Sequence, residues 1–105
     1  MDNIKVITLC GSIKFMKEFR QTEAMLTRMG FAVITPFFFE QGEEVEVTKE
    51  EALLLGKIHY KKIAIADEIF VIDVDGYIGE STKKEIEYAK LNNKNISYYS
   101  NRSTL

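Results

Sequence analysis

The chain has 105 residues, 46% of them hydrophobic and 29% charged, a composition that predicts one soluble globular domain over residues 1–105. Its 14 Lys and Arg residues against 16 Asp and Glu residues give a formal charge of −2, which argues against binding to a nucleic-acid polymer. The single cysteine, Cys10, excludes an internal disulfide, and without a membrane-length apolar run or a secretory pattern we expect a cytoplasmic protein that makes no membrane contact.

The first half of the chain predicts two buried strands separated by an amphipathic helix. Residues 4–10 are β-branched and nearly continuous in apolar content, as in a strand that is covered on both faces. Between residues 13 and 29 apolar side chains recur at three- and four-residue spacings, which predicts a helix capped by Ser12. Residues 31–36 predict a second strand, and residues 37–47 have no clear period and predict a loop.

The second half repeats the pattern of helix and strand. Thr48 and Glu51 have the spacing of a capping box, which predicts a helix from there to about residue 66. The apolar patterns that follow predict a third strand, a third helix and a weaker fourth strand, at residues 68–74, 82–91 and 95–100.

The alternation of strands and helices predicts an α/β fold with an open, doubly wound parallel sheet of the flavodoxin or Rossmann-like kind. Right-handed crossovers place four strands in the order 2-1-3-4, with helices on both faces. Ligands of such sheets bind at the carboxyl ends of the strands, where the strand order reverses. That crevice would lie between the first and third strands, bordered by residues 10–14 and residues 73–85.

Residues 10–14 (CGSIK) form the first candidate binding segment. Gly11 allows a ligand close to the backbone, the free amides of a helix start attract anions, and Ser12 and Lys14 add donors. The segment matches neither a phosphate loop nor a dinucleotide fingerprint, so a turn glycine followed by a helix cap explains it about as well. Cys10 is more simply a buried strand residue than a nucleophile. By position, we assign the whole segment to substrate binding: Cys10, Gly11, Ser12, Ile13 and Lys14.

Residues 73–85 (DVDGYIGESTKKE) lead from the third strand into the third helix. Thr82 and Glu85 have capping-box spacing, and spacing alone favours a Glu85 that folds back onto its own helix start. The functional alternative points Glu85 into the crevice as a carboxylate, whose charge the helix N-terminus and the neighbouring Lys83 and Lys84 would favour. A carboxylate in that place can attack an electrophilic sugar carbon or stabilise an oxocarbenium ion.

The residues around Glu85 resemble the signature of the nucleoside 2-deoxyribosyltransferase superfamily. Ala66 and Asp67, an apolar strand, a glycine-containing loop and residues 85–89 (EIEYA) are similar to its motif, which is a strand followed by G-x-x-E-[LI]-x-x-A. The turn at residues 10–13 (CGSI) resembles the start of the related deoxynucleoside-monophosphate N-glycosidases. The resemblance covers most of the chain.

The resemblance implies N-glycosidic chemistry on a small nucleoside or nucleoside monophosphate, without a cofactor. Glu85 takes the position of the family nucleophile, which attacks C1′ of a deoxyribose and displaces the base. Another base or water then resolves the glycosyl ester. Residues of the two loops would surround the sugar and a 5′-phosphate, namely Gly11, Ser12, Ser81 and Thr82.

Two positions depart from the family pattern. His59 replaces an aspartate of the second helix, and Gly79 replaces an acidic residue six positions before the nucleophile. His59 is a catalytic candidate because an imidazole can do acid/base work near neutral pH, although a partly exposed helix histidine is the simpler alternative. Asp73 and Asp75 could orient a ribose hydroxyl or end a strand, and we favour involvement of Asp73. The candidate site thus has catalytic Glu85, His59 and Asp73, with Asp75, Gly79, Ser81 and Thr82 against the substrate.

Residues 37–39 place three phenylalanines after Pro36, and such clusters mark an interface or a surface for ligand stacking. Strand alternation would bury the first and third rings and leave the middle one unexplained. We expect a homodimer or higher homo-oligomer, with one or more rings at the interface or on a nucleobase. No His, Cys and Asp residues have metal-ligand spacing, so no metal is expected. The acidic residues after this cluster predict a solvated loop face: Glu43, Glu44 and Glu46.

Three functions follow from these observations. The leading one is an enzyme that cleaves or exchanges an N-glycosidic bond, with hydrolysis slightly preferred because two predicted helix starts and Lys14 converge where a phosphate could bind. The second is a non-catalytic nucleotide-binding or sensing module on the same fold, which needs the glycine turns but no acid/base pair. The third is an interaction domain whose phenylalanines dock a partner while Glu85 only caps its helix.

Overall fold

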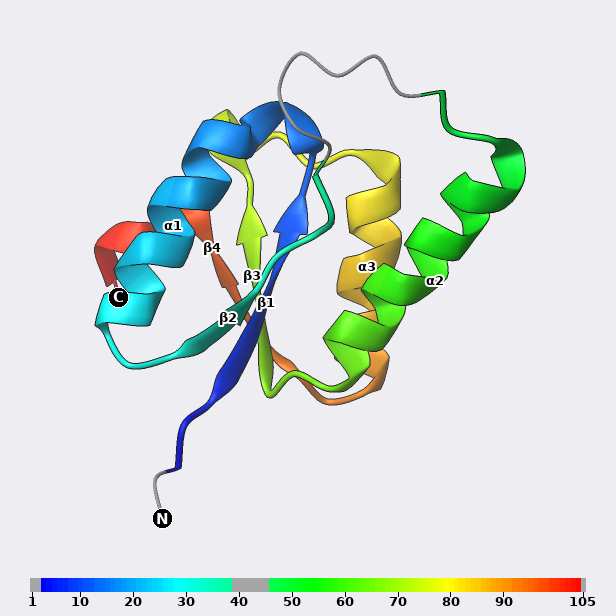
Figure 1. Ribbon diagram of the computed structural model, residues 1–105. Helices are drawn as coiled ribbons and strands as arrows, with labels where there is room; N and C mark the ends of the chain where they lie inside the picture. Colours follow the sequence, from blue (N-terminus) through cyan, green and yellow to red (C-terminus); the bar gives the residue numbers. More distant parts are fainter. Residues whose placement is uncertain (1–2, 39–45, 105) are drawn as a thin grey trace.

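The computed structural model describes residues 3–38 and 46–104, which form a four-stranded parallel sheet with helices on both faces (Figure 1). The strand order is β2-β1-β3-β4, as predicted. All three strand pairs are parallel. Their register places Gly11 beside Ile72, at the carboxyl ends of the two central strands. The expected open α/β fold is therefore confirmed, with strands β1 (Val6–Gly11), β2 (Ala32–Ile34), β3 (Glu68–Ile72) and β4 (Asn95–Tyr98).

The helices differ from the predicted ones mainly at their ends. Ser12 caps a short 3-10 turn, because its Oγ accepts a hydrogen bond from the Lys14 amide at 3.3 Å, so the first α-helix begins only at Met16. None of the helices in the described part of the chain is long and apolar enough to cross a membrane. The α-helices are α1 (Met16–Arg28), α2 (Lys49–Ala64) and α3 (Glu80–Leu91), and the 3-10 turns are η1 (Ile13–Phe15), η2 (Val74–Gly76) and η3 (Tyr99–Thr104).

Two hydrophobic cores lie on opposite faces of the sheet. Successive residues of β1 and β3 point to alternate faces, which explains why both strands are apolar along most of their length. In Figure 1, α1 and η3 cover one face while α2 and α3 cover the other. The core under α1 contains Ile7, Leu9, Phe19, Leu26, Phe70 and Ile72. The core under α2 and α3 contains Cys10, Ile63, Ile69, Val71, Ile86 and Ala89.

The phenylalanine cluster is arranged differently from the expectation. Phe38 packs edge-on against Phe19 with ring centroids 5.2 Å apart, and Phe37 is 56% exposed. The expected alternation is wrong because the strand has already ended at Ile34, so the middle ring is the one that packs against the core. Phe39 lies outside the described residues, as do two of the three acidic residues of the loop, while Glu46 is exposed.

Polar ties join the end of α2 to the sheet. Lys94 donates from Nζ to the carbonyl oxygens of Ala64 at 3.0 Å and Ala66 at 2.7 Å, where the helix C-terminus attracts a cation. The Asp67 carboxylate accepts from the backbone amide of Val6 at 2.8 Å. These bonds orient the last turns of α2 against β1 and β3.

The start of α2 is held by the predicted capping box. Thr48 Oγ1 accepts from the Glu51 amide at 3.1 Å, and the Thr48 amide donates to Glu51 Oε1 at 3.3 Å. Thr48→Ala should weaken this turn by about 1 kcal/mol and speed amide exchange at Glu51 about fivefold, because the cap holds that amide. Hydrogen exchange followed by NMR checks this, with Lys49→Ala as the control. Equal exchange in wild type and variant would contradict the cap.

Candidate active site

The loops that follow β1 and β3 lie in contact, as the strand order predicts. The amino group of Lys14 lies 3.5 Å from the centroid of the Tyr77 ring. Phe15 meets the same ring edge-on, with centroids 5.8 Å apart. The cation is therefore engaged by an aromatic face, an interaction that joins the two borders of the predicted crevice.

The residues of the first segment, residues 10–14, differ in burial and in hydrogen bonding. Cys10 is fully buried in the core under α2 and α3, whereas Ile13 and Lys14 are exposed. Ser12 is half-buried, and its hydroxyl is used by η1. The helix start expected after Ser12 is thus a three-residue 3-10 turn, and the α-helix amides begin further along the chain.

Asp73 has a structural partner at the end of β3. Its side chain is buried, and its two carboxylate oxygens accept from the Ser100 amide at 2.8 Å and the Ser100 hydroxyl at 2.7 Å. These bonds tie η3 to the sheet, so the preference for Asp73 on a sugar hydroxyl is not supported by its contacts. Asp75 and Gly76 follow in a tight turn with φ of 53° and 79°, and Asp75 is exposed there.

The third helix begins two residues earlier than predicted. Gly79 is its N-cap residue and Glu80 its first helical residue, so Thr82 is the third residue of α3 and is buried. Gly79 makes no side-chain cap bond, and the spacing of Thr82 and Glu85 does not form a capping box. Ser81 remains exposed at the edge. Glu85 therefore lies in the second turn of the helix, where it does not fold back onto the helix start.

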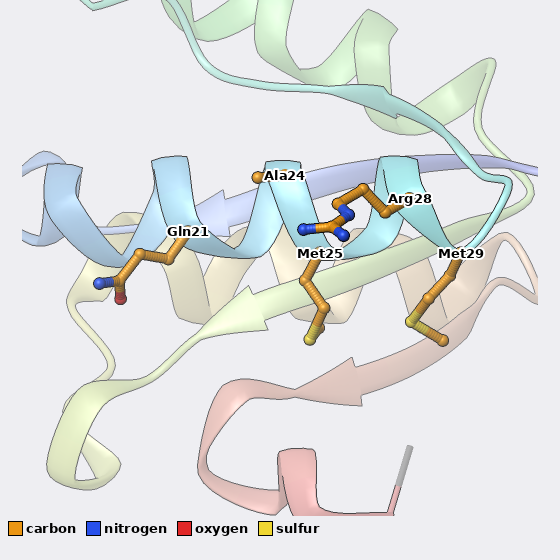
Figure 2. A pocket seen from close by; sticks show the side chains of 5 residues that line it. All are labelled: Gln21, Ala24, Met25, Arg28 and Met29. Atoms are coloured by element: carbon orange, nitrogen blue, oxygen red, sulfur yellow. The ribbon is translucent and has the colours of Figure 1, made fainter.

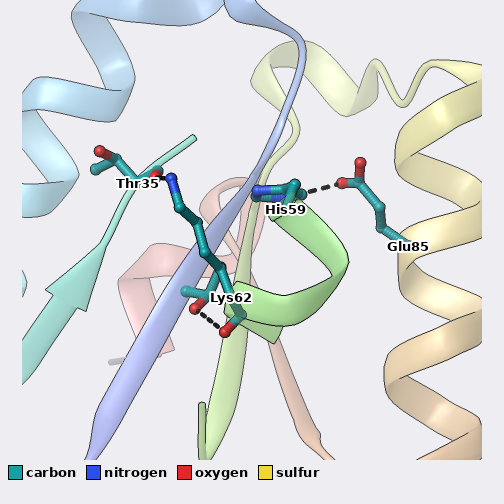
Figure 3. A network of polar contacts seen from close by, with 5 residues as sticks. Thr35, His59, Lys62 and Glu85 are labelled. Carbon is teal, nitrogen blue, oxygen red and sulfur yellow. Dashed lines mark hydrogen bonds and ion pairs between the residues drawn. The ribbon is translucent and has the colours of Figure 1, made fainter. Parts of the chain in front are cut away.

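Glu85 instead faces His59 across the gap between α3 and α2 (Figure 3). His59 Nε2 lies 3.4 Å from Glu85 Oε1, and the two side chains are 11% and 15% exposed. This separation exceeds that of a strong charge-assisted hydrogen bond, and His59 Nδ1 is buried with no hydrogen-bond partner among the described residues. His59 is thus mostly buried, with a small part of its side chain exposed.

Cys10 lies behind this pair, at the end of β1. Burial raises the pKa of its thiol well above the ordinary value, and the charge of Glu85 and a hydrogen bond to it raise that pKa further. A thiol in these surroundings stays protonated at neutral pH, which fits a buried strand residue and not a nucleophile. Burial likewise raises the pKa of Tyr60, with smaller effects from Glu85, Cys10 and Glu87.

Lys62, one turn of α2 beyond His59, makes two bonds that the sequence analysis did not predict. Its Nζ donates to the Thr35 carbonyl oxygen at 2.9 Å, and its own carbonyl oxygen accepts from Thr8 Oγ1 at 2.8 Å (Figure 3). These bonds join α2 to β1 and to the segment after β2. Because Lys62 is three residues after His59, both lie on one face of α2, and this spacing of two polar residues was the available signal.

Three potential metal ligands meet at the same place. Ligand atoms of Cys10, His59 and Glu85 all lie within 4.8 Å of one another. The three residues come from β1, α2 and α3, which are far apart in the sequence. Their sequence spacing therefore gave no sign of the cluster.

A hollow of 530 Å³ lies elsewhere on the molecule, along α1. Figure 2 shows the side chains that line it, which come from α1 and its C-cap residue Met29: Gln21, Ala24, Met25, Arg28 and Met29. Since α1 covers the face of the sheet opposite α2 and α3, the hollow is not part of the site around Glu85.

Taken together, these elements define a doubly wound α/β domain with a carboxylate–imidazole pair beside the carboxyl end of β1. A solved 2-deoxyribosyltransferase from the psychrotolerant bacterium Bacillus psychrosaccharolyticus has the same fold, with a TM-score of 0.69 over 89% of this chain and 70% of that chain, at 21% sequence identity. No protein-family model matches the chain, and no curated protein matches it. The chain thus has a 2-deoxyribosyltransferase fold, and the resemblance expected from the residues around Glu85 is confirmed at the level of the fold.

Proposed function

We propose that the protein cleaves or exchanges the N-glycosidic bond of a small nucleoside or nucleoside monophosphate, with Glu85 as nucleophile. The observation that carries this proposal is the contact of Glu85 with His59, 3.4 Å away, in place of a capping bond to its own helix. The Glu85 side chain also retains 15% exposure, so it is not sealed off from solvent. The similarity of fold to a 2-deoxyribosyltransferase supports a nucleoside as the substrate class.

The proposed reaction has two displacements at one carbon. A carboxylate oxygen of Glu85 attacks C1′, the C1′–N bond breaks, and its electron pair leaves with the base, which takes up a proton. The resulting ester is then attacked at C1′ by a second base or by water, which restores the carboxylate. A second base gives exchange, and water gives hydrolysis.

His59 would hold and assist the nucleophile. Its Nε2 contacts one oxygen of Glu85, which orients the carboxylate towards an incoming C1′. As the only histidine of the chain, it is also the group best suited to pass a proton to the departing base. The thiol of Cys10 supports Glu85 from the buried side through its hydrogen bond.

Substrate contacts would come from the edges of the two loops. Ser12 and Ser81 are the hydroxyl groups there that we assign to the sugar or a phosphate, and Gly79 lies beside the Tyr77 ring, where an added Cβ would be 3.6 Å from the Tyr77 hydroxyl oxygen. Lys14 would have to leave that ring to reach a phosphate. The assay therefore compares each deoxynucleoside with its 5′-monophosphate.

A panel of deoxynucleosides and their 5′-monophosphates tests the function directly. We expect chromatography to detect free base released from at least one of them, and an exchanged nucleoside when a second base is added. Calorimetric binding of a nucleotide without release of base from any member of the panel would overturn the proposal. That result would instead favour a nucleotide-binding module, an alternative suggested by His59 in the place of the aspartate in the resembled transferases.

A further inference from the structure

The chain's only cysteine and only histidine converge on one carboxylate. Cys10 is the second-last residue of β1, His59 lies on α2 and Glu85 lies on α3. Their ligand atoms are within 4.8 Å of one another. One sulfur, one imidazole nitrogen and one carboxylate oxygen are the donors that Zn²⁺ takes in proteins. We propose that these three side chains bind a thiophilic divalent cation, of which Zn²⁺ is the best match.

The distances fit such a cation with little movement. In a tetrahedral zinc site with bonds of about 2.0–2.3 Å, ligand atoms are separated by about 3.3–3.7 Å. His59 Nε2 and Glu85 Oε1 are already 3.4 Å apart, which is a weak distance for a hydrogen bond and a suitable one for two ligands of one ion. Side-chain adjustments of about 1 Å would bring the third ligand into the same range.

The imidazole has unused capacity to bind a ligand. His59 Nδ1 is buried and has no hydrogen-bond partner among the described residues, and an unsatisfied buried polar atom costs free energy. Rotation of the ring presents either nitrogen to the position between Cys10 and Glu85. A cation bound at Nδ1 would compensate for this missing bond, whereas a cation bound at Nε2 would use the 3.4 Å pair with Glu85.

The donor set also selects the kind of cation. Mg²⁺ and Ca²⁺ prefer shells made of oxygen atoms, whereas a thiolate with an imidazole favours Zn²⁺ or Co²⁺. On binding, the S–H bond of Cys10 breaks, a sulfur–metal bond forms, and the proton goes to solvent. A fourth position remains for water from the exposed side of Glu85. The cation would occupy the proposed nucleophile and inhibit base release, a consequence that depends on the proposed function although the metal site does not.

Cobalt substitution tests the site on the full untagged chain without any substrate. Because Cys10 is the only thiol, a sulfur-to-Co²⁺ charge-transfer band can come from no other residue. We expect a band that saturates at one Co²⁺ per chain and disappears when Zn²⁺ is added. It should be lost in Cys10→Ser and strongly weakened in both His59→Gln and Glu85→Gln.

Glu87→Gln is the matched control, because Glu87 is exposed on the same helix two residues from Glu85 and should leave the band unchanged. Circular dichroism establishes that each variant is folded, and His59→Gln provides the decisive comparison if Cys10→Ser does not fold. Absence of a sulfur band in the wild type, or an equal band in folded His59→Gln, overturns the metal site. Base release by the metal-free wild type, in a protein that shows no sulfur band when Co²⁺ is added, would refute the metal site alone. A sulfur band with Co²⁺, in a protein that releases no base when it is metal-free, would refute the proposed function alone.

Discussion

Glu85→Gln should lower the rate of base release at least about 10³-fold while the protein stays folded, because an amide cannot form the glycosyl ester. The amide keeps the volume of the side chain and can still accept a hydrogen bond from His59. We expect the free energy of unfolding to fall by only about 1 kcal/mol, the usual cost of one weakened polar contact. Chromatography of released base and urea denaturation measure the two effects separately.

Glu87→Gln removes a neighbouring charge from the solvent side of α3 and serves as the control for this substitution. It should retain wild-type rates, because its side chain is not part of the contact between Glu85 and His59. Mass spectrometry of the wild type during turnover should also detect the covalent glycosyl adduct, and the adduct should be missing from Glu85→Gln. Equal rates of base release in the wild type and Glu85→Gln would remove Glu85 from the mechanism.

The contrast between Thr48/Glu51 and Thr82/Glu85 marks a limit of local sequence patterns. Both pairs have the same spacing, yet only the first forms a capping box. In the second pair the chain leaves the extended conformation at Gly79, so the helix has already begun when it reaches Thr82. Capping-box spacing shows that two side chains could cap a helix start, but it does not show that the helix starts there. The structure buries Thr82 in the first turn of the helix, and the spacing of Thr82 and Glu85 alone does not predict that burial.

The position of His59 could not be predicted from apolar periodicity. Of the apolar residues along α2, the structure leaves Leu53, Ile58 and Ile65 exposed, while it buries Ile63 together with the polar His59. The strand order, in contrast, was predictable, because the strands of an alternating α/β chain are apolar on both faces and their crossovers have one hand. Topology thus placed the loops correctly, whereas the contact of His59 with Glu85 depends on how α2 packs against α3.

Gly11→Ala should lower the free energy of unfolding by about 2–4 kcal/mol, from overpacking together with backbone strain. Gly11 has φ of 149°, and an added Cβ would lie 2.9 Å from the Ile72 carbonyl oxygen and 3.3 Å from Phe19 Cζ. The carbonyl belongs to the neighbouring strand, so relief requires β1 and β3 to separate where the two loops meet. Base release should fall too, because Cys10 would be displaced from Glu85.

Gly56→Ala is the matched control, since a Cβ at Gly56 in α2 meets no heavy atom within 4 Å. Alanine should raise helix stability there by up to about 1 kcal/mol and leave the rate of base release unchanged. Urea denaturation of both variants gives the comparison, and a rate measurement on each shows whether the effect reaches the site. If Gly11→Ala were as stable as Gly56→Ala, the close contact of Gly11 with the Ile72 carbonyl oxygen would not constrain the ends of β1 and β3, and the prediction would be wrong.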